Sequence, residues 1–562
     1  MLRRLTASLL GLGALALMLP TAAATGPAAL TAAPADDTIH VGPDLNGGRP
    51  LPFADKTLPL EPFSSRSEVG DRKFWFAIDD ARGEIYIKPF KLRGKGRRVE
   101  VWVTPDLSFP AGDCRNDERV EVTDAQVRYL IDQFDNNIYP KESRVFSRPP
   151  DRDGSDAQAS NFIDVGPRYY RGPGEKIVVL VDNVRDKNYY DTNNAGNNPY
   201  IIGFFYSEFN ELTDRNVMTI DGYDWIHRTR SDPPHEPDPG DLCRSMPARP
   251  HLIEETFAHE YQHLLEYYED PSETTWLNEG LSDWAQTLTG YADPRRTVQD
   301  RGFDRHIECF LGFCNQLTDY NPNPSDMGPE NSLTVWRDQG DNEILADYGA
   351  AYTFMELIST RYGRSFMKSL HRNNYDGFRS VRRILRRKAI PTTPNELVAD
   401  WAAAMALDAV LDGGATLIGG NAAELRIRTL TGRINWDTTH AYASPGAPPN
   451  GSDYVRLRDR NGAYLNAAQI DTIAFAAPPT PPKTTFTVQL IAYDDAGTSA
   501  WIGELPLDEN QSGSLSGAAL DAVIGTNAQT VAAIVTFHDP TESETAYARY
   551  TLEVDGVTQP GG

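Results

Sequence analysis

Two histidines and a glutamate lie within five consecutive residues, in the order His259-Glu260-Tyr-Gln-His263. The surrounding residues have a helical pattern, and positions four apart share one face of a helix. Two imidazoles one turn apart can each present a nitrogen to one zinc ion at about 2.0 to 2.1 Å. Glu260 then projects beside the open coordination position, where it can act as a base toward a water whose pKa the metal lowers to about 7. The spacing therefore predicts a hydrolytic zinc site.

A second helical pattern begins shortly after this segment and carries two carboxylates one turn apart, Glu279 and Asp283. Glu279 is placed to supply the third zinc ligand, and Asp283 to accept the other N–H of a liganding histidine and fix its tautomer. H-E-x-x-H alone often arises by chance, so this second segment is what favours a catalytic site. Three ligands leave a position for water, whereas a structural zinc site is normally closed by a fourth side chain.

Together the two segments resemble the gluzincin metallopeptidases, with H-E-x-x-H on one helix and N-E-G-x-x-D on the next, and in particular the hyicolysin-type secreted bacterial neutral metallopeptidases. The resemblance covers about residues 176–411, and its specific part runs from His259 to Asp283. It implies that Glu279 is a zinc ligand, that Asp283 orients a histidine and that a downstream tyrosine stabilises an oxyanion. Tyr348 is the candidate tyrosine and Tyr352 the alternate, although both tyrosines could instead pack in the core.

The motifs favour hydrolysis of peptide bonds in a protein or peptide substrate, with Glu260 as the general base. Gluzincin aminopeptidases carry a G-x-M-E-N segment that holds the free amine of the substrate, and this chain has none. The segment Asn216–Asp221 instead has the pattern of an edge strand that can pair with an extended peptide, which favours an endopeptidase. The competing hypothesis is a secreted zinc-containing binding or adhesion protein without peptidase activity.

The first residues have the composition of a secretory signal peptide, with a basic Arg3-Arg4 pair, an apolar run from Ala7 to Leu19 and small residues up to Ala24. The run is too short to cross a bilayer, so we expect a secreted protein with no membrane anchor, exported by the general or the twin-arginine route. The formal net charge of −25 would repel nucleic acid and anionic lipid surfaces, and neither is an expected partner.

Four cysteines in an exported chain predict two disulfides. Cys309 and Cys314 would close a short local loop, which leaves Cys114 to pair with Cys243. A zinc site built from cysteines is the alternative, although the chain contains no C-x-x-C.

Other chemistry is less well supported by the sequence. The oxygen-rich segment 182–194 could bind calcium, a possible second metal, although such clusters more often form loops. Several histidines lack partners at ligand spacing and are interpreted as ordinary surface or core residues: His227, His235, His251, His306 and His371.

The elements that must position these residues are strands first and helices afterwards. The strands are expected at 73–78, 84–87, 99–103, 176–181, 201–206 and 216–221, and the helices at 252–268, 277–289, 348–362, 380–388 and 395–411. A capping box of Thr123 and Gln126 opens an earlier helix. This order predicts an α+β fold with a zincin-like catalytic domain, made of an N-terminal mixed sheet, an active-site helix and a C-terminal helical lobe.

Composition divides the chain into four segments. Residues 1–24 are the signal peptide, and residues 25–110 are a low-complexity stretch with a small antiparallel β unit, either a propeptide or a lobe of the enzyme. Residues 111–440 are the gluzincin-like zinc metallopeptidase domain. After a linker rich in Pro and Gly, 441–452, residues 453–560 are expected to form a C-terminal β-sandwich, a candidate to bind a surface, a carbohydrate or a protein.

Overall fold

A computed structural model describes residues 38–41, 67–192, 200–238, 240–241, 243–339, 343–439, 442 and 446–560. The expected signal peptide lies outside these residues, as do parts of the linker 441–452 and of the oxygen-rich segment 182–194. In the described part of the chain, none of the helices combines the length and apolarity that crossing a membrane would need.

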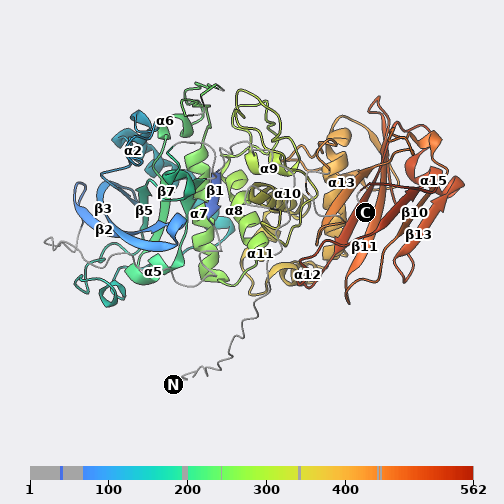
Figure 1. The fold of residues 1–562 in the computed structure, drawn as a ribbon. Helices are drawn as coiled ribbons and strands as arrows, with labels where there is room; N and C mark the ends of the chain where they lie inside the picture. Colours follow the sequence, from blue (N-terminus) through green and yellow to red (C-terminus); the bar gives the residue numbers. More distant parts are fainter. Residues whose placement is uncertain are drawn as a thin grey trace, which may run out of the picture. The chain divides into compact units, whose positions relative to one another are not determined.

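A seven-stranded mixed sheet holds the N-terminal strands in the order β1-β6-β7-β5-β4-β3-β2. These strands are β1 (Thr38–Val41), β2 (Arg72–Asp79), β3 (Glu84–Lys95), β4 (Val99–Val103), β5 (Ile177–Asp182), β6 (Tyr200–Phe204) and β7 (Asn216–Asp221). The central strands β5 and β7 are buried at every position, and most of their residues are apolar. Such continuous burial is typical of a sheet that is covered on both faces. Figure 1 shows helices beside this sheet, including α2 (Asp124–Gln133), α5 (Ser207–Thr213) and α7 (Leu252–Glu269).

The pairing of the strands bears on two expectations about this sheet. The strands β2, β3 and β4 pair antiparallel with one another as expected. Because β4 also pairs in parallel with β5, with Val99 opposite Ile177, these strands continue into the larger sheet, and a boundary at residue 110 cuts through it. The expectation that Asn216–Asp221 is an edge strand is wrong, since β7 lies between β6 and β5. Its uniform burial, which its apolar residues allow, is what an internal strand requires.

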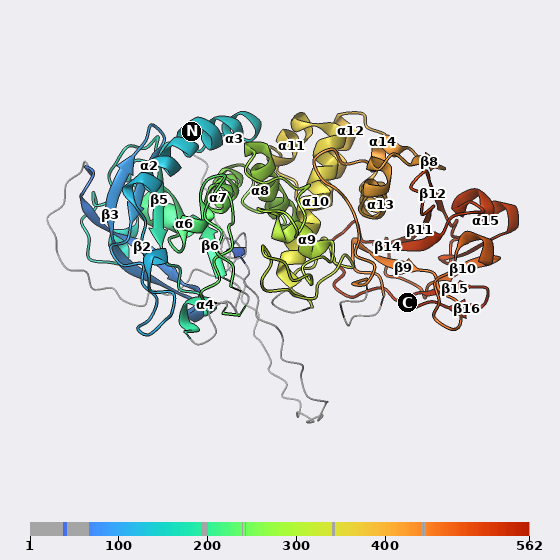
Figure 2. The same ribbon diagram turned by 90° about the horizontal axis from the view of Figure 1, so that it is seen from above.

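Helices make up the part of the chain that follows the sheet, and the fold is α+β as expected. The helices before α7 also include α3 (Tyr139–Val145), α4 (Lys187–Tyr190) and α6 (Trp225–Arg228). After α7 come α8 (Thr275–Thr289), α9 (Arg305–Phe310), α10 (Ile344–Tyr362), α11 (Arg364–His371), α12 (Gly377–Arg387), α13 (Pro394–Asp412) and α14 (Ala422–Leu425). Capping boxes open α2 at Thr123 and α13 at Thr393. Figures 1 and 2 both show α7 and α8 side by side, and the two helices are in extensive contact.

Two four-stranded sheets form the C-terminal part, in the orders β13-β10-β15-β16 and β14-β11-β12-β8. Their elements are β8 (Thr416–Ile418), β9 (Gly451–Arg456), β10 (Thr472–Ala476), β11 (Thr485–Tyr493), β12 (Ser499–Glu504), β13 (Ser512–Ser516), α15 (Gly517–Ile524), β14 (Thr530–His538), β15 (Thr551–Val554) and β16 (Val557–Thr558). Side chains of both sheets share one apolar core, to which Phe475 and Val488 belong. Ile491 and Ile534 belong instead to the core of the helical part, where β11 and β14 contact α13. The C-terminal sheets are thus packed against the helices, and β8 joins them from before the expected boundary.

Candidate metal centre

Two imidazole nitrogens and one carboxylate oxygen lie close together between α7 and α8. The Nε2 atoms of His259 and His263 are 2.9 Å apart, and each is 3.1 Å from Oε2 of Glu279. All three side chains are buried. Among the described residues, they are the group of histidines, cysteines and carboxylates that lies close enough to share a metal ion. Two imidazoles and one carboxylate are a donor set that zinc prefers, so the residues fit the metal that the motif predicts.

Each histidine is held from behind by a side chain of α8. Asp283 Oδ1 lies 2.9 Å from Nδ1 of His259, and Asn278 Oδ1 lies 2.8 Å from Nδ1 of His263. An acceptor at Nδ1 fixes the proton on that atom and leaves Nε2 free to bind a metal. Asp283 has the position that the sequence analysis expected. Asn278 was missed, and its place directly before Glu279 in the N-E-G segment was the available signal.

A third histidine completes the surroundings of Asp283. His306 Nδ1 lies 3.3 Å from the second carboxylate oxygen of Asp283, and Gln286 donates to the first at 2.7 Å. From the sequence, His306 was interpreted as an ordinary histidine because it has no partner at ligand spacing, and Asp283 is 23 residues away. The start of α9 brings it into the site. Spacing along one helix could not reveal this contact.

The structure separates the two candidate tyrosines. The Tyr348 ring stacks on the His306 ring with centroids 4.6 Å apart, and lies 6.2 Å from the His259 ring. The Tyr352 hydroxyl is instead 2.7 Å from Oγ1 of Thr287, in the last turn of α8. Tyr348 is therefore the tyrosine next to the candidate ligands His259, His263 and Glu279, called the metal-ligand group below.

Glu260 is fully buried beside both histidines, and the backbone N–H of Phe205, just after β6, donates to its carboxylate. Burial raises the pKa of Glu260 to about 7, although His259 and His263 oppose the shift. A carboxylate with a pKa near neutrality can both take up and release a proton at physiological pH.

The charges of His259 and Glu279, two of the candidate ligands, stabilise each other. Burial by itself lowers the pKa of His259, but hydrogen bonds to Asp283 and Glu279 outweigh it and raise the pKa to about 10. Burial likewise raises the pKa of Glu279, yet the two histidines hold it below its usual value. A metal ion that binds here must displace the proton that His259 carries.

Gly280, which follows Glu279, allows a third helix to approach. A Cβ atom at this position would lie 2.9 Å from Cγ of Met355 and 3.0 Å from the carbonyl oxygen of Ala351, both in α10. The glycine of the N-E-G segment therefore lets α10 pack directly on the helix that carries the candidate ligand. This contact also places Tyr348, at the start of α10, near His259.

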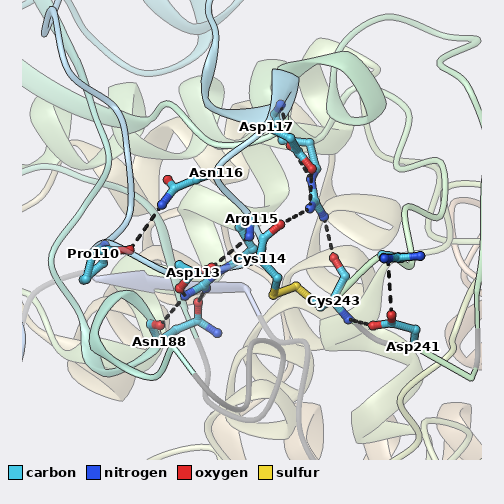
Figure 3. Close-up of a disulfide and its surroundings, with 11 residues drawn as sticks. Pro110, Asp113, Cys114, Arg115, Asn116, Asp117, Asn188, Asp241 and Cys243 are labelled. Carbon is cyan, nitrogen blue, oxygen red and sulfur yellow. Dashed lines mark hydrogen bonds and ion pairs between the residues drawn. A yellow bond between two sulfur atoms is a disulfide. The ribbon is translucent and has the colours of Figure 1, made fainter.

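The four cysteines form two disulfides, Cys114–Cys243 and Cys309–Cys314, which are the expected pairs. Figure 3 shows the first disulfide, which joins the segment after β4 to the segment before α7. The Arg119 guanidinium donates to the carbonyl oxygens of both cysteines, at 3.1 Å for Cys114 and 2.7 Å for Cys243. The disulfide thus ties the strand-rich part to the chain that enters the metal-site helix.

The other histidines considered in the sequence, and the oxygen-rich segment, form hydrogen bonds with other partners. His227 bonds Asp224, His251 bonds Glu254, His371 bonds Glu266 and His235 accepts from the backbone of Ala248. In the oxygen-rich segment, the Asp186 carboxylate accepts the backbone N–H groups of Tyr189 and Ile201. Asp186 therefore caps the start of α4.

No protein-family model matches the chain. The chain is similar to the neutral metalloprotease ShpI of Staphylococcus hyicus, with 21% identity over 315 residues. The matched region covers 55% of this chain and 56% of the Staphylococcus protein, so the chain spans about half the length of that relative. This similarity is distant, and it agrees with a metallopeptidase relationship.

Proposed function

We propose that this protein is a secreted zinc metallopeptidase of the gluzincin type. The observation that supports the proposal is the cluster of His259, His263 and Glu279, whose ligand atoms lie 2.9 to 3.1 Å apart with Glu260 beside them. The similarity to a protein named as a neutral metalloprotease agrees with it. In the proposed layout, the sheet, α7 and the following helices form the catalytic domain, and the C-terminal sheets are an accessory unit.

A zinc ion at this cluster would act as a Lewis acid, polarising a substrate carbonyl and lowering the pKa of a water molecule. In the proposed mechanism, Glu260 takes the proton from the attacking water and passes it to the leaving amine. Tyr348 is proposed to donate a hydrogen bond to the carbonyl oxygen as negative charge develops there. Asp283 and Asn278 keep both imidazoles in one orientation throughout the reaction.

We further propose that the enzyme is an endopeptidase. The chain lacks the G-x-M-E-N segment of gluzincin aminopeptidases. An extended segment of the chain itself, β1, pairs with β6 from Thr38 opposite Tyr200 to Val41 opposite Phe204. Phe205, the next residue, donates to Glu260. An extended peptide that replaced β1 on this strand would therefore pass close to the catalytic base.

The test combines metal content with cleavage of peptides blocked at both ends. We expect one zinc per chain in the wild type, and cleavage that a chelator abolishes. Glu260→Gln is expected to keep the zinc and to lose at least about 100-fold in kcat, because the base contributes to the reaction and not to metal binding. His263→Ala is expected to lose both zinc and cleavage.

The outcomes separate the alternatives. Near-normal turnover by Glu260→Gln would remove Glu260 from the mechanism. Cleavage restricted to peptides with a free amino terminus would replace the endopeptidase by an aminopeptidase. Bound zinc with no cleavage of any peptide would favour the binding or adhesion protein instead.

A further inference from the structure

Glu542 lies in the loop after β14, in the C-terminal part, but its carboxylate is bonded to two helices of the metal-site part. Oε2 accepts the indole N–H of Trp276 in α8, and Oε1 accepts the backbone N–H of Phe378 in α12, both at 2.7 Å. The loop thus reaches 266 residues back along the chain to contact the helix that carries Glu279.

The fit around this carboxylate is tight. Gly377 has a φ of +53°, and a Cβ atom there would lie 2.2 to 2.6 Å from the carboxylate atoms of Glu542. Only glycine therefore leaves room for Glu542. The Gly377 N–H donates to Glu273, which precedes α8, at 2.7 Å. The two carboxylates together join the start of α8 to the start of α12.

The loop that presents Glu542 is itself held in one conformation. The Asp539 carboxylate accepts the backbone N–H groups of Thr541, Ser543 and Glu544 at 2.6 to 2.9 Å. Asn450 exchanges two hydrogen bonds with the backbone of Asp539, both at 2.9 Å. Glu542 is therefore supported by the end of β14 and is not a freely rotating surface side chain.

Trp276 transmits this contact to the metal-ligand group. Its ring is buried between Phe354 of α10 and Phe378 of α12, with centroids 5.7 and 4.9 Å away. Trp276 lies one helical turn before Glu279, and Asn278 is in the same turn. The rotation of this turn about the helix axis decides where the side chains of Glu279 and Asn278 point.

We propose that Glu542 is a positioning residue through which the C-terminal sheets hold the first turn of α8 in the orientation that metal binding requires. This inference rests on the proposed function, because it takes Glu279 to be a zinc ligand. It assigns the C-terminal sheets a part in building the metal site. The half-buried carboxylate of Glu542, with its two hydrogen bonds, is the contact that does so.

The test measures the dissociation constant for zinc by competition with a chromogenic chelator, in the full-length protein. Glu542→Ala is expected to bind zinc about 10-fold more weakly, the lower end of the loss seen when groups that orient metal ligands are removed. Trp276→Phe keeps the ring but removes the N–H, and should cause a similar loss. The double variant should be no weaker than Glu542→Ala alone, because both substitutions remove one interaction. Glu542→Gln keeps one acceptor oxygen and should lie between Glu542→Ala and the wild type.

A matched control is Asp494→Ala, which removes a carboxylate of the same C-terminal part that accepts from Thr498 N–H at 2.7 Å and makes no contact with α8 among the described contacts. Asp494→Ala should leave the zinc constant unchanged, and the Tm of every metal-free variant is recorded beside it. A zinc constant for Glu542→Ala equal to that of the wild type, or an equal loss in Asp494→Ala, would overturn the inference alone. Failure of the wild type to bind zinc would overturn the proposed function as well.

Discussion

At the residue scale, the metal-ligand group depends on a shell of side chains that differ for the two histidines. His259 is oriented by a carboxylate, Asp283, which also contacts Gln286 and His306. His263 is oriented by a neutral amide, Asn278. A carboxylate partner makes an imidazole a stronger donor to a metal than a neutral amide does. We therefore expect the network around Asp283 to contribute more to zinc affinity than Asn278.

His306 gives the first prediction at this scale. His306→Phe retains a ring that can stack on Tyr348 but removes the contact with Asp283 Oδ2. We expect zinc affinity to fall about 10-fold, because Asp283 loses one of the groups that hold it. The measurement is again competition with a chelator.

The control for this prediction is His235→Phe. His235 packs on Tyr320 at the same 4.6 Å between centroids as His306 on Tyr348, but it does not touch Asp283. This variant should bind zinc like the wild type. If both variants lose affinity equally, the loss reflects destabilised packing and not the Asp283 contact.

At the element scale, the N-terminal strands are part of the sheet on which the metal-site helix packs. Trp75 of β2 and Trp102 of β4 lie in the same apolar cluster as Val178 and Leu180 of β5. Removing β2 to β4 would expose one face and the edge of β5, a strand that is buried throughout. We therefore expect the strands β2 to β4 to be needed for the fold, as a lobe of the enzyme would be and a removable propeptide would not.

Two truncated chains test this conclusion. A chain that starts at Ser67 lacks β1 but keeps β2 to β4, and should fold with a Tm close to that of the full chain. It should also cleave blocked peptides faster, because β6 no longer pairs with residues 38–41. A chain that starts at Pro105 should fail to give a cooperative unfolding transition by circular dichroism. A folded, stable chain from Pro105 would restore the propeptide interpretation.

At the scale of the whole molecule, contacts between distant segments hold the sheets and helices together. The described residues between 38 and 560 belong to one compact unit. The Cys114–Cys243 disulfide spans 129 residues of this unit, whereas Cys309–Cys314 spans five. Closing a longer loop removes more conformational freedom from the unfolded chain. The first disulfide should therefore stabilise the molecule more than the second.

Paired serine substitutions test this difference. Cys114→Ser with Cys243→Ser should lower the free energy of unfolding by about 5 kcal/mol, and Cys309→Ser with Cys314→Ser by about 2 kcal/mol. Urea unfolding in the presence of a chelator measures both without a contribution from bound metal. An equal loss in the two double variants would mean that the length of the loop does not decide their contribution.

Local sequence patterns were enough to predict most helices and strands near the metal centre, although α9, which carries His306, was not expected. The capping box at Thr123 and the apolar run of β5 depend on neighbouring residues, and they predict elements that the structure contains. Helical periodicity likewise places His259 and His263 on one face of α7, because four residues make about one turn. Glu279 was predicted as the third ligand from the second helical pattern, and the resemblance to the gluzincins implied the same role.

Only the tertiary structure could decide the contacts that depend on the packing of distant elements. The strand order places β7 in the interior of the sheet, and it places the end of β6 beside Glu260. The sequence pattern of an apolar strand does not show whether that strand is internal or at the edge. His306 meets Asp283, and Glu542 meets Trp276, across elements with no fixed spacing along the chain. The sequence by itself thus determined which side chains could bind a metal. Long-range packing decided what holds those side chains in place, because contacts between distant elements leave no periodic signal in the chain.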